Sequence, residues 1–374
     1  MRKYVVFLFD SSVHHIHHLL GIVSEFSKLH SDFDIQVFVA DKLVYKLISK
    51  SPYLNGIEVK NITMRLWPWR KNRFGSLAYK YIAKNNFTDL NNAHGLIGAS
   101  FGMHRLSLFG IDRPKMIYTN HGTGDGEYGF ASELKSMDMI LVAGEKMRVQ
   151  IERQSMFRDG LPFKILEVGY PKSDFYNVDI FGNKLKCPKL FDNNKPVLFY
   201  NPHWMAELNS FNILGISLIK WIMETDRFNL VVSPHPLFWK FDRKNSKYLR
   251  TINNINIHVN EGKLCAADTS LMQVADIYVG DVSSSVYEWL VFDRPILFLN
   301  NGVENWESNP HYSMWGFGPV ASDVMEMKKI LMNLTEIEND FKILRKEAFR
   351  RTFKETPVSP SKFAAQSILK FLEQ

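Results

Sequence analysis

Short, uninterrupted apolar runs alternate along this chain with segments whose apolar residues recur at helical spacing. The first run, Tyr4–Phe9, is closed by Asp10, and such a run is typical of a strand buried on both faces, as in a parallel sheet. The next segment, Ile16–Leu29, has the apolar period of a helix, with Ser12 as a candidate N-cap. This alternation predicts an α/β fold with parallel sheets covered by helices.

The alternation occurs twice, and one stretch rich in Gly, Pro, Asn and charged residues interrupts it between residues 173 and 195. The 374 residues also exceed the usual size of one domain. We therefore expect an N-terminal α/β domain over residues 1–175, a linker over 176–195, a C-terminal α/β domain over 196–357 and a closing helix over 358–374. The other predicted strands are Ile35–Ala40, Gly95–Ala99, Met116–Thr119, Met139–Val142 and Ile165–Val168 before the linker, and Val197–Tyr200, Leu230–Ser233, Ile255–Val259, Ile277–Val279 and Pro295–Leu299 after it.

Composition limits the partners and the cellular compartment that we expect for this chain. Its formal net charge is +7, from 46 Lys and Arg against 39 Asp and Glu, which favours anionic partners but is too dilute for a nucleic-acid binder. Two cysteines, Cys187 and Cys265, are too few for a disulfide scaffold or a four-cysteine zinc site. No apolar run approaches the ~20 residues of a transmembrane helix, and the run in Met1–Phe9 is too short for a secretory signal. We expect a soluble, cytoplasmic protein.

Histidines follow three of the predicted strands. His121 comes after Met116–Thr119 and is followed by Gly122 and Thr123; His203 comes after Val197–Tyr200, and His235 lies between two prolines after Leu230–Ser233. Ligands of doubly wound sheets bind beyond the carboxyl ends of the strands. Histidine at such a place can act as a general base near neutral pH. The alternative is a loop histidine that only bonds a carbonyl group.

A further polar cluster follows the predicted strand Ile277–Val279. Asp281 and the small hydroxyl residues precede an apolar helix, and backbone N–H groups and hydroxyls at a helix start can bind an anion. Glu288, one turn into the helix, could accept hydrogen bonds from ribose hydroxyls. Plain N-capping without a ligand is the alternative. The hydroxyl residues are Ser283, Ser284 and Ser285.

Three more segments have weaker signals. The histidines at positions 14, 15, 17 and 18 are candidate metal ligands. No carboxylate or cysteine lies close to them in the sequence, so we expect no metal site. Residues 124–129 match the dinucleotide fingerprint formally, but they lie too far from the preceding strand, and no nicotinamide cofactor is expected. Arg70, Lys71 and Arg73 lie among aromatic residues and suggest contact with a membrane surface or a polyanionic acceptor. A solvated basic loop is the alternative.

Taken in order, these motifs resemble the CDP-glycerol glycerophosphotransferases of teichoic acid and capsule assembly. His121-Gly122-Thr123 is similar to the family's first-domain motif, and His235-Pro236 to its second-domain motif. Asp281, Ser283, Ser284, Glu288 and Pro295 resemble its Asp-x-Ser-Ser segment, and the resemblance covers about residues 95 to 300. The chain departs from the family at Asn120, where an aromatic residue is usual, and at Pro202-His203-Trp204.

The resemblance implies a GT-B-like fold, with two doubly wound Rossmann-type domains facing across a cleft, the first on the acceptor side and the second binding the donor. It implies transfer of glycerol phosphate from CDP-glycerol, or a related nucleotide donor, to a hydroxyl of a lipid-linked or polyanionic glycan acceptor, without a cofactor and without nucleic acid. The implied catalytic residues are His121 as general base and His235 near the phosphates. Gly122, Thr123, His203, Asp281, Ser283, Ser284, Ser285 and Glu288 would bind the donor, and His14, Arg70, Lys71 and Arg73 would serve the acceptor or a peripheral contact with the inner face of the plasma membrane.

Three other functions stay open at this point. A GT-B glycosyltransferase that uses a nucleotide sugar would employ the same pyrophosphate site. A nucleotide-sugar 2-epimerase would need acids in the cleft, for which Asp125 and Glu127 are candidates. A non-catalytic nucleotide-binding protein would tolerate the loss of His121.

Overall fold

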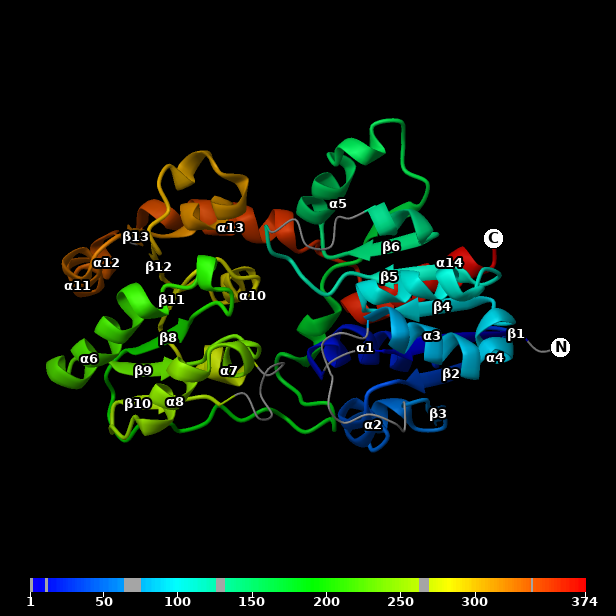
Figure 1. The fold of residues 1–374 in the computed structure, drawn as a ribbon, viewed down its shortest axis with the longest axis horizontal. Helices are drawn as coiled ribbons and strands as arrows, with labels where there is room; N and C mark the ends of the chain where they lie inside the picture. The colour runs from blue at the N-terminus through cyan, green and yellow to red at the C-terminus, as the bar shows by residue number, and fades with distance from the viewer. Residues whose placement is uncertain (1–2, 11–12, 64–74, 126–131, 262–268, 338) are drawn as a thin grey trace. The chain divides into compact units, whose positions relative to one another are not determined.

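The computed structural model describes residues 3–10, 13–63, 75–125, 132–261, 269–337 and 339–374. The chain divides into two compact units, each an α/β layer structure (Figure 1). The first unit comprises Met1–Gly122, Glu127–Leu185 and Arg351–Gln374, and the second comprises Thr123–Gly126 and Lys186–Arg350.

The first unit contains a seven-stranded sheet in which every pairing is parallel, with the order β3-β2-β1-β4-β5-β6-β7. The predicted strands are all present to within two residues at each end. The one addition, β3, is a polar edge strand that hydrophobic patterning does not reveal. The strands are β1 (Lys3–Phe9), β2 (Phe33–Val39), β3 (Glu58–Asn61), β4 (Gly95–Gly98), β5 (Lys115–Thr119), β6 (Met139–Val142) and β7 (Lys164–Glu167).

Strand β1 shows why an unbroken apolar run suits the middle of this sheet. Val5 and Phe7 pack into an apolar cluster on one face of the sheet, and Val6 and Leu8 pack into a second cluster on the other face. Successive side chains of a strand point to opposite faces, so both faces are buried and neither tolerates a polar residue. The helices of this unit are α1 (Ile16–Phe26), α2 (Lys42–Ile48), α3 (Gly75–Asn85), α4 (Phe87–Asn91), α5 (Glu145–Glu152) and α14 (Pro360–Leu372).

The second unit contains a six-stranded parallel sheet in the order β10-β9-β8-β11-β12-β13. One face carries a cluster of aliphatic residues together with the aromatic rings of Tyr200 and Phe211. The other face carries Phe199, Tyr278 and Trp289, with the Phe199 and Trp289 rings stacked 6.3 Å apart. The strands are β8 (Val197–Asn201), β9 (Asn229–Val232), β10 (Ile257–Val259), β11 (Ile277–Gly280), β12 (Ile296–Leu299) and β13 (Val320–Ala321). The two-residue β13 was not predicted.

Helices of the second unit are mostly short. They are α6 (Ile216–Thr225), α7 (Phe238–Phe241), α8 (Arg243–Thr251), α9 (Ser270–Gln273), α10 (Ser285–Trp289), α11 (Val324–Met332) and α12 (Leu334–Ile337), while α13 (Asn339–Thr352) runs past the unit's end at Arg350. A turn of π-helix, Phe211–Gly215, precedes α6. The predicted helix Ile213–Glu224 therefore begins with a wider turn than the prediction assumed.

Of two predictions at the start of the chain, one is wrong and the other concerns a residue outside the described part of the structure. Helix α1 ends at Phe26, not at Leu29, because the following residues form a turn. Ser12, the expected N-cap, lies outside the described residues, and a 3-10 turn, η1 (Val13–His15), leads into α1. His14 and His15 therefore lie on the same turn, between β1 and α1 in the sequence.

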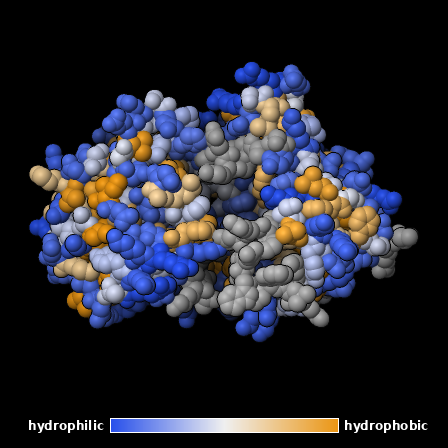
Figure 2. Space-filling view, viewed as in Figure 1, coloured by the Kyte–Doolittle hydropathy of each residue, from blue (hydrophilic) through white to orange (hydrophobic). Residues whose placement is uncertain are grey.

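The C-terminal helix α14 packs against the first sheet. Leu372 lies so close to Gly95 of β4 that a Cβ there would come within 2.8 Å of its side chain. At the start of the helix, the Ser361 N–H donates to Asp174 at 2.9 Å. None of the described helices combines the length and hydropathy that a bilayer-spanning helix needs. Figure 2 shows hydrophobic residues on the displayed face only in small groups among hydrophilic ones.

Candidate active site

In the first unit, histidines from two chain segments meet at the carboxyl end of the sheet. His14 and His15 lie on η1, directly after β1, and His121 follows β5. The ring centroids of His15 and His121 are 4.0 Å apart, those of His14 and His15 4.1 Å, and those of His14 and His121 5.9 Å. His18, on α1, is buried, and its ring lies 6.3 Å from that of His121. The sequence patterns predicted each segment but not this meeting.

Burial dominates the electrostatics of these histidines. It lowers the pKa of His121, which a backbone hydrogen bond to Ala99 partly offsets. Burial also lowers the pKa of His15 and His18 well below the ordinary value, and neighbouring histidines add repulsion in both cases. The Nδ1 atom of His121 lies 3.3 Å from the Tyr118 hydroxyl, which orients the ring. A ring held in this way, next to a strand end, can accept a proton from a hydroxyl group.

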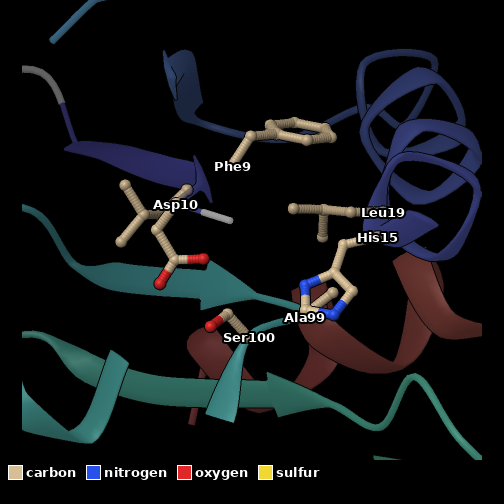
Figure 3. A pocket seen from close by; sticks show the side chains of 7 residues that line it. Phe9, Asp10, His15, Leu19, Ala99 and Ser100 are labelled. Atoms are coloured by element: carbon tan, nitrogen blue, oxygen red, sulfur yellow. The ribbon is translucent and has the colours of Figure 1, made fainter. Parts of the chain in front are cut away.

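A small cavity of about 10 Å³ lies beside His15, between the ends of β1 and β4 (Figure 3). This is about the space that one water molecule needs. Asp10 and Ser100 line it, and the Tyr79 hydroxyl donates to the Asp10 carboxylate. Burial raises the pKa of Asp10 to about 7. In the sequence Asp10 marks only the end of a strand, because its partner Tyr79 is 69 residues away.

In the second unit, His203 and His235 follow the adjacent strands β8 and β9, and their ring centroids are 5.9 Å apart. The Nδ1 atom of His203 accepts the Met205 N–H at 3.1 Å, and that of His235 accepts the Leu237 N–H at 3.2 Å. A neutral imidazole that accepts at Nδ1 carries its proton on Nε2. Burial lowers the pKa of both rings to about 4, so at neutral pH each ring offers one Nε2–H donor.

Asp281 supports the backbone of His203. Its Oδ2 accepts the His203 N–H at 2.8 Å and the Ser210 N–H at 3.2 Å. Only 1% of its surface is exposed, and its Oδ1 makes no hydrogen bond to the described residues. Burial raises the pKa of Asp281 to about 7. The expectation that Asp281 binds a donor remains a proposal, and the contacts favour a positioning role.

A chain of hydroxyl groups lies beside Asp281. The Ser283 and Ser285 hydroxyls are 2.8 Å apart, and Ser285 donates to Asn201 Oδ1 at 2.6 Å. Ser284 is exposed and makes no capping hydrogen bond, and Gly124 packs against it: a Cβ on that glycine would lie 3.5 Å from Ser284 Cβ. Helix α10 has only five residues, so the hydroxyls offer more to an anion than the helix dipole does.

The remaining predicted donor residues are Glu288, on α10, and Gly122 and Thr123, which adjoin the boundary between the units in the sequence. Glu288 and Thr123 are buried, and Gly122 is half-buried at the residue where the chain leaves the first unit. The Tyr287 hydroxyl lies 2.6 Å from both carboxylate oxygens of Asp125. Because this contact occupies Asp125, the acid is poorly suited to the elimination chemistry of an epimerase.

Some predicted residues lie outside the described residues. Arg70, Lys71 and Arg73, expected at an acceptor or membrane, are among them, as is Glu127. His14, expected on the acceptor side, is exposed and belongs to the histidine cluster of the first unit.

Asn201 is a site residue that sequence reasoning passed over. Its Nδ2 donates to the Ser233 carbonyl at 2.6 Å, while its Oδ1 accepts from Ser285 and from Tyr278. It therefore ties together the ends of β8, β9 and β11. The signal was present, because Asn201 is the first polar residue after an apolar run.

Comparisons with solved structures establish the fold class. The wall teichoic acid polymerase TagF is similar over 100% of this chain and 89% of its own, with a TM-score of 0.62 and 15% identity. UDP-GlcNAc 2-epimerase from Neisseria meningitidis, solved with UDP-GlcNAc, is similar over 99% of this chain and 100% of its own, with a TM-score of 0.65 and 13% identity. At these identities the likeness concerns the fold, and it confirms the predicted GT-B-like α/β class. No curated protein sequence matches the chain.

Comparison with family sequence patterns gives the function class. The pattern described as CDP-glycerol:poly(glycerophosphate) glycerophosphotransferase matches residues 77–359, well over half of the chain. The match spans the His121 motif, His203, His235 and the serine cluster. The chain therefore belongs to the CDP-glycerol:poly(glycerophosphate) glycerophosphotransferase family and is a transferase enzyme of that family.

Proposed function

We propose that the protein transfers glycerol phosphate from CDP-glycerol to a hydroxyl group of a lipid-linked or polymeric acceptor during the synthesis of a cell-surface polymer, either teichoic acid or capsule. The acceptor oxygen attacks the β-phosphorus, the phosphorus that carries glycerol. A new P–O bond forms there, the pyrophosphate P–O bond breaks, and CMP leaves with the bonding electrons. In this account the second unit binds the donor and the first unit supplies the base.

The observation that carries the donor assignment is the pair of imidazole N–H donors on adjacent strands. His203 and His235 both use Nδ1 as an acceptor for a backbone N–H, at 3.1 and 3.2 Å, so both present Nε2–H. Two neutral donors about 6 Å apart by ring centroid suit the oxygens of a diphosphate. In phosphoryl transfer such donors act mainly by positioning and by stabilising charge on the leaving group.

The serine cluster extends this donor site. Ser284 is exposed and its hydroxyl carries no capping bond, so it is suited to a phosphate oxygen. Ser283 and Ser285 are bonded to each other and Ser285 to Asn201, so they hold the loop in shape. Glu288 is assigned to the ribose through the family resemblance. Asp281 acts through the His203 backbone, as a positioning residue.

We assign the general base to His121. It follows a strand end, as catalytic groups of such sheets do, and histidine changes protonation near neutral pH. Its ring is oriented by Tyr118, and it takes the proton of the attacking hydroxyl. A positioned base of this kind typically contributes 10²–10⁴-fold in rate.

The setting follows from the family and from charge. The +7 net charge favours both an anionic donor and a polyanionic acceptor. Arg70, Lys71 and Arg73, together with His14, are proposed to meet the acceptor or the inner face of the plasma membrane. The runner-up, a nucleotide-sugar glycosyltransferase, would use the same phosphate donors but attack an anomeric carbon.

A donor panel tests the proposal. Purified protein with a glycerophosphate-primed acceptor is offered CDP-glycerol, CDP-ribitol and UDP-sugars in parallel, and nucleotide release is measured. Release of CMP from CDP-glycerol, dependent on the acceptor, is the expected result. Release of UDP from a sugar donor, with no CMP from CDP-glycerol, would contradict the proposal and favour the glycosyltransferase.

A further inference from the structure

We propose that His14, His15 and His121 form a binding site for one divalent transition-metal ion of the Zn²⁺ type, and that the bound ion inhibits transfer by taking the lone pair of His121. The binding half of this proposal stands on geometry alone. The inhibition half rests on the proposed function, because it needs His121 to be the base.

The three histidines already have the proximity that a metal site requires. One ligand atom from each lies within 4.8 Å of the others. A tetrahedral zinc ion with Zn–N bonds of 2.0–2.1 Å holds its nitrogen ligands about 3.3 Å apart. The ligand atoms therefore need to approach one another by about 1.5 Å at most.

The donor set and its surroundings suit this class of ion. Three imidazoles favour Zn²⁺, Cu²⁺ or Ni²⁺ over Mg²⁺ and Ca²⁺, which prefer oxygen ligands. His14 is exposed and the other two are half-buried, so an ion has access from solvent and room for water as a fourth ligand. The Tyr118 hydroxyl beside His121 Nδ1, at 3.3 Å, is the kind of contact that orients ligating histidines.

The fold, and not the neighbouring sequence, brings the third ligand to this site. His14 and His15 lack a third ligand in the neighbouring sequence, but the parallel pairing of β1 with β4, and of β4 with β5, brings the end of β5 to the same edge of the sheet. His121, more than 100 residues later, completes the set. An imidazole nitrogen that ligates an ion cannot accept the proton of a hydroxyl group, so metal binding and base catalysis compete for His121.

Direct metal binding is the test that does not depend on turnover. Untagged protein is titrated with Zn²⁺ by calorimetry and with Co²⁺ by visible absorption, which reports tetrahedral coordination. His14→Ala is the main variant, because its exposed ring makes misfolding unlikely to confound the result. His121→Ala is the second variant. His30→Ala is the control: it removes an exposed histidine of the same unit that lies outside the cluster.

One Zn²⁺ per chain is expected in the unaltered protein and in His30→Ala, with affinity at least tenfold weaker in His14→Ala and His121→Ala. Binding that is unchanged in both cluster variants would overturn the site. In the CMP-release assay, Zn²⁺ should inhibit the unaltered protein over the same concentration range in which it binds. Binding at the cluster without inhibition would overturn the competition with the base, and absence of CMP release without metal would refute the proposed function while leaving the binding result intact.

Discussion

Replacing Asp281 by Asn tests the support that holds His203. The Asp281 carboxyl is buried, and its Oδ2 accepts the N–H groups of His203 and Ser210. The Asn carbonyl oxygen can accept both N–H groups, but the side chain carries no charge at any pH. The substitution therefore separates the hydrogen-bonding role of the residue from the cost of burying its charge.

The size of the effect follows from the raised pKa. Burial raises the pKa of Asp281 from 3.8 to about 7, and at 1.36 kcal/mol per pKa unit this corresponds to about 4 kcal/mol. A carboxyl group with a raised folded-state pKa stabilises the fold most below its unfolded pKa, and this contribution disappears as the pH rises to about 7. Asp281→Asn should therefore gain about 4 kcal/mol in unfolding free energy relative to the unaltered protein between pH 4 and pH 7.

The comparison with the unaltered protein is essential, because other groups titrate in the same range. The pKa values of His203 and His235 are lowered to about 4. Their contribution to stability is present above the unfolded value of 6.5 and is lost as the pH falls toward 4, which is the opposite sense to Asp281. These terms are common to both proteins and cancel in the difference.

Urea unfolding followed by tryptophan fluorescence measures this difference in the relevant unit. Six of the eight tryptophans belong to the second unit, and the other two are Trp67 and Trp69. Asp226→Asn is the matched control, because Asp226 is exposed and Lys195 lowers its pKa, so this variant should gain no stability as the pH rises. A difference between Asp281→Asn and the unaltered protein that does not vary with pH would refute the reasoning.

Three further predictions concern the serines, a glycine contact and the basic segment. Ser284→Ala should weaken CDP-glycerol binding in calorimetry without loss of stability. Ser285→Ala should weaken binding and also lose about 1 kcal/mol of stability, because it removes the hydrogen bond to Asn201. Unchanged donor binding in both variants would place the phosphates elsewhere. Gly144→Ala should destabilise the first unit by roughly 1–3 kcal/mol, because its Cβ would lie 2.6 Å from the Thr352 carbonyl oxygen; an unshifted urea midpoint by circular dichroism would contradict that contact. Replacing Arg70, Lys71 and Arg73 by Gln should reduce association with anionic liposomes, most strongly at low salt; an unchanged salt midpoint would indicate a solvated loop.

Much of the fold was predictable because its strands are buried on both faces. An apolar run such as Val5–Phe9 leaves few alternatives to a central parallel strand, and the same holds for β6, β9 and β12. The edge strand β3 was missed because it carries Val59 among polar residues, and β13 because its two residues are too short for a pattern. The local hydrophobic pattern also does not predict that Arg351–Gln374 belongs to the first unit. This assignment depends on the surface against which the C-terminal helix packs.

The positions of the candidate residues at strand ends were predictable one by one, but their arrangement was not. Strand ends gave His121, His203 and His235, because ligands gather where parallel strands end. The Nδ1 bonds that set the tautomer of His203 and His235 come from backbone N–H groups two residues later, and their presence depends on the local turn. The approach of His15 to His121 depends on the order of strands in the sheet, which residue types alone do not specify.

Two measurements on one variant determine whether His121 is the base for attack on CDP-glycerol. The rate of acceptor-dependent CMP release and the dissociation constant for CDP-glycerol are determined for the unaltered protein and for His121→Ala. We expect a fall in rate of about 10²-fold or more, with donor affinity nearly unchanged, because the donor is proposed to bind to the second unit. A variant that releases CMP at a comparable rate would contradict the account.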